Sequence, residues 1–324
     1  MKIIRVTPTD DLQSILAQIK EPTTVFLKKG VYDCKLIVAA NDVKLLGEER
    51  ETTVIRYGDY AKKPHADGRE YNTFRTFTVC VTGERAVIEN LTIENFNTSP
   101  ELVGQCVALS VNARLFHARN VNLVSTQDTL FTAPFPDDLV IRYAGLTDDK
   151  TYYDGFIPRD QLYMEGNSFQ YYENCKICGT VDFIFGGAQA LFENCELVSL
   201  RDKRNTGFVA APSHSLKQEY GYLFHNCLFK NGGAEPSSVY LARPWRDFGK
   251  CDFIDCKTEN HIAPALFDKW NDTYRDRTAR FSYYNLGEEN LAPVPWAKRL
   301  TPERANEIIN TFNAMKMNYF VEKD

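Results

Sequence analysis

A short fragment recurs six times between residues 87 and 257, and it constrains the fold more than any other feature. Each copy has an apolar run, an Asn or Asp, and a second apolar run. These positions are Asn90, Asn120, Asn174, Asn194, Asn226 and Asp255, with spacings of 30, 54, 20, 32 and 29 residues. Repeats of roughly 20–30 residues with no helix between them are typical of a solenoid of β-coils. A sandwich is disfavoured because no Asn-Gly hairpin turn recurs between strands.

Equivalent residues stack in such a solenoid because successive coils lie about 4.8 Å apart. The Asn amides are then expected to pair along the axis. Repeated apolar positions are expected to fill the interior, where a free cysteine behaves as a small hydrophobe. The residues predicted to form this stacked core are Cys175, Cys195, Cys227, Cys256, Phe192, Phe224 and Phe229. Zinc binding by Cys175 and Cys178 is the alternative, but a lone C-x-x-C lacks the second ligand pair.

Composition and charge exclude several classes of protein. The chain has 324 residues, 44% of them apolar and 25% charged, which is the composition of a globular protein, and its length allows one large domain or two average ones. We expect a single β-helix domain spanning residues 1–324. A net charge of −5 gives no general attraction to nucleic acid or to an anionic membrane. No run of 18 apolar residues and no apolar leader are present. We therefore expect a cytoplasmic monomer with reduced thiols, no cofactor, no metal, and neither nucleic acid nor membrane as a partner.

Two kinds of segment depart from the repeat. The 54-residue spacing holds about 30 extra residues, at about 132–165, which we expect to be an insertion that leaves the solenoid. It is either a surface elaboration or a wall of a cleft that limits the length of the substrate. Short helices are expected at both termini, the second beginning after Thr301 with Ile308, Ile309 and Phe312 as its apolar stripe. We expect each helix to cover one open end of the solenoid.

Polar groups inside apolar runs are the candidates for chemistry. Asp182 lies within Val-Asp-Phe-Ile-Phe, where a carboxylate is costly to bury unless it is paired. Arg243, also in an apolar run, is a suitable bidentate partner. Asp128 lies one coil earlier if the insertion is looped out. Two carboxylates in one apolar cleft cannot both ionise cheaply, so Asp182 is expected to be the charged nucleophile and Asp128 the protonated general acid.

Two amides complete this group of polar side chains. Gln105 and Gln127 supply neutral N–H donors that suit a developing oxyanion. The alternative for any single Asp in a β-run is a structural hydrogen bond or a turn. Four segments of this chain place polar groups among apolar residues, and they contain Gln105, Gln127 with Asp128, Asp182 and Arg243. Their number favours a catalytic site over a purely structural role.

At these residues the sequence resembles the pectin methylesterases, a carbohydrate esterase family built on a right-handed parallel β-helix. The resemblance runs from about residue 30 to residue 298. It includes the family's Q-A-V-A-L, Q-D-T-L-Y, D-F-I-F-G and L-G-R-P-W segments in the family's order. Their first residues here are Gln105, Gln127, Asp182 and Leu241. The departures are Cys106, Phe131, Ala242 and Cys34, and none of them removes a catalytic group.

The resemblance implies a role for each matching position. Asp182 would attack the methyl-ester carbonyl of a galacturonate, and Asp128 would protonate the departing methanol and then activate water. Gln105 and Gln127 would stabilise the anionic intermediate, and Arg243 would hold Asp182 ionised. The positions expected to contact substrate are Thr73, Phe131, Phe185 and Trp245.

The implied activity is removal of methyl esters from galacturonan or oligogalacturonides, with release of methanol. The alternatives are a β-helix galacturonan lyase or hydrolase, an esterase of another acyl group such as acetyl, and a non-catalytic carbohydrate-binding β-helix. A hydrolase would need two acids flanking a glycosidic bond, and the pairing of Asp with Gln and Arg suits acyl transfer better.

Overall fold

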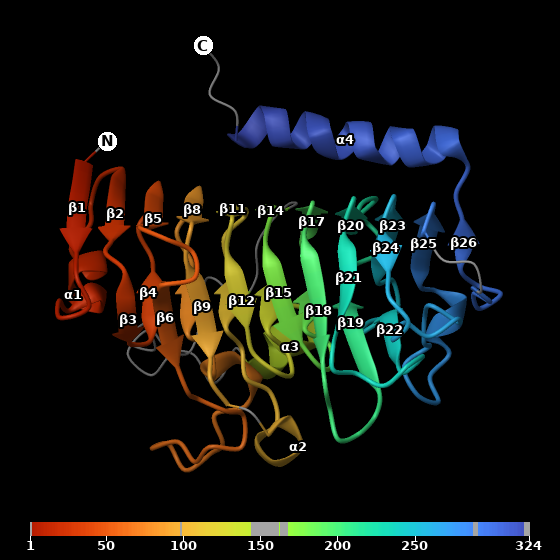
Figure 1. Ribbon diagram of the computed structural model, residues 1–324, viewed down its shortest axis with the longest axis horizontal. Coiled ribbons are helices and arrows are strands. Elements are labelled where there is room, and N and C mark those ends of the chain that lie inside the picture. The colour runs from red at the N-terminus through yellow and green to blue at the C-terminus, as the bar shows by residue number, and fades with distance from the viewer. Residues whose placement is uncertain (1, 98, 144–161, 163–167, 288–290, 321–324) are drawn as a thin grey trace.

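The chain winds into a parallel β-helix (Figure 1). The computed structural model describes residues 2–97, 99–143, 162, 168–287 and 291–320. Within them, three sheets run along the molecule, and every pair of neighbouring strands in these sheets is parallel. Figure 1 shows the coils stacked side by side from β1 to β26. The predicted β-helix is therefore confirmed.

The strands divide among the sheets as follows. The eleven-stranded sheet contains, in spatial order, β1 (Lys2–Val6), β2 (Thr23–Leu27), β5 (Val43–Gly47), β8 (Ala86–Glu89), β11 (Leu115–Arg119), β14 (Phe169–Glu173), β17 (Gln189–Glu193), β20 (Tyr222–His225), β23 (Lys250–Ile254), β25 (Arg280–Tyr284) and β26 (Lys298–Arg299). The eight-stranded sheet contains β3 (Gly30–Asp33), β6 (Thr53–Tyr57), β9 (Thr92–Asn95), β12 (Asn122–Val124), β15 (Lys176–Gly179), β18 (Glu196–Leu200), β21 (Leu228–Gly232) and β24 (Lys257–Thr258). The seven-stranded sheet contains β4 (Leu36–Val38), β7 (Val79–Val81), β10 (Leu109–Val111), β13 (Leu130–Thr132), β16 (Ile184–Gly186), β19 (Gly207–Pro212) and β22 (Val239–Ala242).

The repeated Asn marks the turn between the eleven-stranded and the eight-stranded sheet. Asn120 has φ 53° and Asn90 has φ 59°, a left-handed conformation that Asn tolerates better than most residues. The Nδ2 of Asn120 donates to the Oδ1 of Asn90 at 2.7 Å, and Asn226 donates to Asn194 in the same way at 2.6 Å. The predicted Asn pairing is confirmed, and the turn geometry adds the reason for Asn.

Aromatic rings and thiols stack inside the coils as predicted. The ring centroids of Tyr172 and Phe192, of Phe192 and Phe224, and of Phe224 and Phe253 lie 4.7, 4.7 and 4.8 Å apart in near-parallel planes. Cysteines 175, 195, 227 and 256 are buried, with their Sγ atoms near backbone carbonyls. All nine cysteines lie in the described part of the chain, and all are free.

The terminal helices exist, but only the first covers an end of the solenoid. Helix α1 (Leu12–Ala17) buries Leu12 and Leu16 in the main core. Helix α4 (Pro302–Phe320) lies along the eleven-stranded sheet instead (Figure 1), with Ile308 and Phe312 in a cluster that includes Leu223 of β20. The expectation that α4 covers the second end is wrong, because the outer face of this sheet is itself apolar there.

Four smaller helical elements occur in the loops that the structure describes. They are α2 (Pro100–Val103), α3 (Asp137–Tyr143) and the 3-10 turns η1 (Thr73–Arg75) and η3 (Arg275–Arg277). Helix α3 belongs to the predicted insertion, whose residues 144–161 and 163–165 lie outside the described residues. No described helix is both long and apolar enough to cross a membrane.

Candidate active site

A cavity of about 310 Å³ lies beside the seven-stranded sheet, and both predicted catalytic carboxylates line it. Asp128 and Asp182 occupy equivalent places in neighbouring coils, two residues before β13 and β16. The backbone N–H of Asp128 donates to the carbonyl of Val181 at 3.1 Å. Both Asp residues have positive φ, 62° and 49°. The same tight turn in two stacked coils thus brings the two carboxyl groups to one cavity.

Arg243 holds Asp182 in place. Its Nε and Nη2 donate to Oδ1 and Oδ2 of Asp182 at 2.8 and 2.7 Å, a bidentate pair. The guanidinium carbon lies 3.8 Å from the ring centre of Phe208 and 4.0 Å from that of Trp270. Packing between two aromatic faces restrains the guanidinium, so the carboxylate of Asp182 has one preferred orientation.

The two carboxyl groups differ in their preference for a proton. Burial, and then the charge of Asp182, raise the pKa of Asp128 well above its usual range. Burial also raises the pKa of Asp182, but the hydrogen bonds and charge of Arg243 oppose that shift. The larger shift falls on Asp128, which is the carboxyl group predicted to hold the proton.

The two glutamines line the same cavity. Their coils are neighbours, since the N–H of Cys106 donates to the carbonyl of Gln127 at 3.0 Å. Arg204 donates from Nη1 to the Oε1 of Gln127 at 2.9 Å, and Asp202 accepts from the Nε of Arg204 at 2.8 Å. With its oxygen occupied in this way, Gln127 presents its amide N–H group as a donor.

Three of the four predicted substrate contacts lie on the cavity wall: Thr73, Phe185 and Trp245. The rings of Phe185 and Trp245 meet edge to face with centroids 5.6 Å apart. Phe131 does not reach the cavity, because its ring is 0% exposed and packs against Phe74, 4.9 Å away between centroids. The prediction that Phe131 contacts substrate is therefore wrong, and the ring supports the wall from behind.

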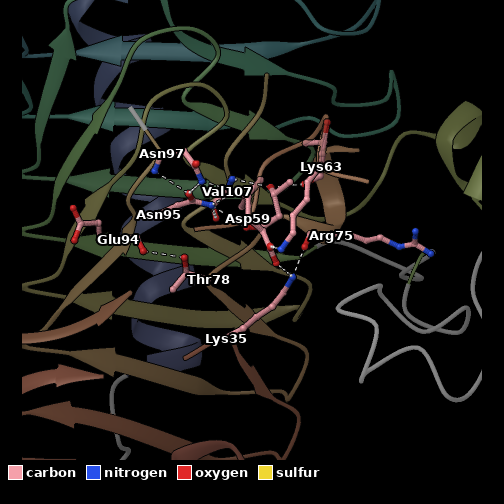
Figure 2. Close-up of polar contacts among 11 residues, drawn as sticks. Lys35, Asp59, Lys63, Arg75, Thr78, Glu94, Asn95, Asn97 and Val107 are labelled. Atoms are coloured by element: carbon pink, nitrogen blue, oxygen red, sulfur yellow. Dashed lines mark hydrogen bonds and ion pairs between the residues drawn. The ribbon is translucent and has the colours of Figure 1, made fainter. Parts of the chain in front are cut away.

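A buried polar network holds the η1 turn that carries Thr73 (Figure 2). Lys35 donates to Asp59 at 2.8 Å and to the backbone carbonyl of Arg75, and Lys63 donates to the second oxygen of Asp59 at 2.6 Å. The amide of Asn95 donates to the carbonyls of Asp59, Thr76 and Val107. This network ties η1 to the strand leading into β10, and it was not expected from the sequence.

Further cavity residues come from sites that no sequence motif marks. Leu139, Arg142 and Tyr143 of α3 form part of the wall, as do Arg246 and Trp270. We expected the insertion to form a wall of the cleft, and helix α3, its described part, agrees with this. The effect of the insertion on the length of the substrate stays a prediction. Tyr152 and Tyr153 of the insertion, which the sequence also offers as rings that could pack against a sugar, lie outside the described residues.

No group of three or more His, Cys, Asp or Glu side chains in the described ranges is arranged to hold a metal ion. The site instead combines two carboxyl groups, two amides and one guanidinium. Groups of these kinds can serve as a nucleophile, a proton donor and oxyanion stabilisers, which are the parts that covalent acyl transfer requires. Fold and site together define a parallel β-helix protein with two buried carboxyl groups in one cavity, an arrangement suited to acyl transfer.

Comparison with known proteins gives the family. The pectinesterase family model matches residues 6–135 and 150–316, so the chain belongs to the pectinesterase family, whose members are carboxylic ester hydrolases. Among Arabidopsis thaliana relatives, Pectinesterase QRT1 is 28% identical over 294 residues, covering 88% of this chain and 67% of that protein. Pectinesterase 31 is 28% identical over 298 residues, covering 89% of this chain and 81% of that protein.

Solved structures share the fold. The pectin methylesterase from carrot superposes with a TM-score of 0.76 at 19% identity, covering 99% of this chain and 97% of that one. The pectin methylesterase from Yersinia enterocolitica superposes with a TM-score of 0.73 at 25% identity, covering 92% of this chain and 97% of that one. A pectin methylesterase in complex with a hexasaccharide superposes with a TM-score of 0.73 at 24% identity, covering 91% of this chain and 90% of that one.

Proposed function

We propose that this protein hydrolyses the methyl esters of galacturonate units in pectin or pectic oligosaccharides, with Asp182 as nucleophile. The observation that carries this is the bidentate contact of Arg243 with Asp182 beside a second carboxyl group, Asp128, whose pKa is raised more strongly. One charged and one protonated carboxyl group in a single cavity are what nucleophilic attack and leaving-group protonation require.

In the first half-reaction, a carboxylate oxygen of Asp182 bonds to the ester carbonyl carbon. The carbonyl oxygen takes up the negative charge, and the amide N–H groups of Gln105 and Gln127 stabilise it. Asp128 gives its proton to the methoxy oxygen as the carbon–oxygen bond breaks. Methanol leaves, and an anhydride between Asp182 and the galacturonate remains.

In the second half-reaction, Asp128 is a carboxylate and takes a proton from water. The water oxygen bonds to the galacturonate carbonyl carbon, and the bond to the oxygen of Asp182 breaks. The free acid of the substrate and the charged Asp182 are restored, with the proton back on Asp128. No cofactor is needed for this balance of atoms and protons.

Sugar binding is proposed for the wall residues Thr73, Phe185 and Trp245. Rings of this kind stack on the apolar faces of sugars, and the half-buried Trp245 stands beside Phe185 at the cavity. The pectin methylesterase of similar fold that was solved in complex with a hexasaccharide supports an oligosaccharide as the bound species.

The test is methanol release from methylated oligogalacturonides by the wild type and by Asp182→Asn. We expect the wild type to release methanol, and Asp182→Asn to lose at least a thousandfold in activity with an unchanged circular dichroism spectrum. Such a loss, about 4 kcal/mol of transition-state stabilisation, is expected when the nucleophile is removed. Activity that survives in the folded variant would exclude Asp182 as the nucleophile.

A further inference from the structure

The amide of Gln127 is held by a residue that does not itself line the cavity. Its Oε1 accepts from the Nη1 of Arg204 at 2.9 Å, and Arg204 is not among the described residues of the cavity wall. The other amide of the cavity, Gln105, forms no side-chain hydrogen bond with any described residue. The two proposed oxyanion donors therefore differ, because only Gln127 has the orientation of its amide set by a neighbouring side chain.

Asp202 in turn holds Arg204. The two residues lie in the turn between β18 and β19, and the carboxyl group of Asp202 accepts from the Nε and Nη2 of Arg204 at 2.8 and 2.5 Å. It also accepts from the backbone N–H of Arg204 at 2.8 Å. Asp202 is 8% exposed, whereas the side chain of Arg204 is 39% exposed. A buried carboxylate thus fixes the direction of a guanidinium on the surface.

The chemistry of the guanidinium decides which end of the Gln127 amide faces the cavity. An arginine side chain has five N–H donors and no acceptor, so it can bind only the oxygen of an amide. The Nε2–H group of Gln127 is then left for the cavity. If the amide turned by 180°, its NH2 group would face the cation and its oxygen would face the developing oxyanion, which would be unfavourable at both ends. A charged donor on Oε1 also polarises the amide and strengthens its N–H group as a donor.

Arg204 reaches Gln127 past the turn that carries Asp182. In the seven-stranded sheet, β16 of the Asp182 coil lies between β13, which follows Gln127, and β19, which follows Arg204. Burial, and then the charge of Asp182, raise the pKa of Asp128, and the charge of Arg204 is among the influences that oppose this rise. It also opposes the rise that burial causes in the pKa of Asp182. The cation therefore lies within electrostatic reach of both carboxyl groups as well as of the amide.

We propose that Arg204 is a positioning residue for the reaction, which fixes the amide of Gln127 so that an N–H group, and not the oxygen, meets the developing oxyanion. Asp202 contributes by holding the guanidinium in line. The inference rests on the proposed function and adds to the site a pair of residues outside the cavity. A donor that is oriented in advance needs no reorganisation as negative charge develops, so it acts on the transition state more than on the binding of substrate.

The first test is the kinetics of methanol release from methylated oligogalacturonides. Arg204→Met keeps the apolar stem and removes the donors. We expect kcat to fall about ten- to thirtyfold with little change in KM, which is less than the loss of about a hundredfold or more that follows removal of an oxyanion donor itself. Arg204→Lys, which still has only donors, should recover part of kcat. Arg201→Met is the matched control, because Arg201 is an exposed arginine of the same turn, 3.7 Å from Glu235, and both constants should stay unchanged.

A double-mutant cycle shows whether Arg204 acts through Gln127. Gln127→Ala should lower kcat about a hundredfold, and adding Arg204→Met to that variant should lower kcat by a further factor of about two or less. Effects that multiply in the double variant would overturn the inference. So would a rise in KM at unchanged kcat in Arg204→Met, since that result would make Arg204 a substrate-binding residue.

The side-chain amide signals of Gln127 in NMR spectra separate this inference from the proposed function. They are assigned by their absence from Gln127→Ala, and they should shift in Arg204→Met and stay unchanged in Arg201→Met, with or without methanol release. An unchanged Gln127 signal in Arg204→Met would overturn the positioning role. If the wild type releases no methanol while the signal depends on Arg204, the esterase is contradicted and the hold of Arg204 on the amide is confirmed.

Discussion

The Nε and Nη2 of Arg243 donate to the two carboxylate oxygens of Asp182 at 2.8 and 2.7 Å, and both side chains are largely buried. Asp128, one coil away at the same cavity, has no such bidentate partner among the described residues. The two carboxyl groups therefore contribute to stability with opposite sign. Asp182 belongs to a compensated ion pair, whereas a charge on Asp128 is costly where it lies.

The first prediction concerns stability at neutral pH. Asp182→Asn leaves Arg243 without its counterion and should lower the free energy of unfolding by about 2–4 kcal/mol. Asp128→Asn replaces a carboxyl group that is costly to ionise with a neutral amide of the same shape and should raise the free energy of unfolding by about 0.5–2 kcal/mol. Urea unfolding at pH 7 measures both. If the two variants shift in the same direction, the assignment of different charge states is contradicted.

The pH dependence of Asp128→Asn provides a second prediction. Because the pKa of Asp128 is raised in the folded state, the unfolded chain loses this proton first as the pH rises. Stability from this group is fully present below about pH 4 and declines above it. The advantage of Asp128→Asn over the wild type should thus be absent near pH 3.5 and grow toward pH 7. A constant difference across this range would show that Asp128 ionises normally.

A third prediction concerns the Asn ladder. Asn120 combines φ 53° with side-chain hydrogen bonds to Asn90 and from Arg50. Asn120→Gly loses those bonds but keeps the backbone conformation, whereas Asn120→Ala also introduces left-handed strain of about 1 kcal/mol. The urea midpoint should fall for both, and further for Asn120→Ala. An alanine variant as stable as the glycine variant would show that the turn conformation contributes little.

The network behind Thr73 gives a fourth prediction. Lys35→Met removes one partner of the buried Asp59 and releases the Arg75 carbonyl, so we expect a loss of about 1–3 kcal/mol in stability. Thr73 should become less well placed, and KM should rise more than kcat falls. A double-mutant cycle with Asp59→Asn should show a coupling of about 1 kcal/mol. Strict additivity of the two changes would mean that the pair acts independently.

The sequence predicted the repeating part of this molecule because stacked coils repeat their side chains. Asn120 and Cys195 could be found from their equivalents in other coils, and Asp182 stood out as a carboxylate in an apolar run. Arg204 and Arg142 could not be found in this way. Arg204 reaches Gln127 across 77 residues from a charged turn, and Arg142 lies on a helix outside the repeat.

Two errors have the same origin. Phe131 of β13 is in register with the cavity residue Phe185 of β16, so the two rings lie on the same face of the sheet, but Phe74 and Phe135 pack against Phe131 and it does not reach the cavity. Helix α4 shows an apolar stripe, yet a stripe does not specify which apolar surface it covers. Both outcomes depend on packing among residues far apart in the chain.

The central claim is that Asp182 attacks a methyl ester and leaves the sugar chain intact. It is tested most directly by mass spectrometry and methanol assay of a fully methylated oligogalacturonide treated with the wild type and with Asp182→Asn. We predict one methanol for each new carboxylate, unchanged chain length, and neither product with the folded variant. Shortened or unsaturated oligosaccharides, or undiminished methanol release by Asp182→Asn, would contradict the claim.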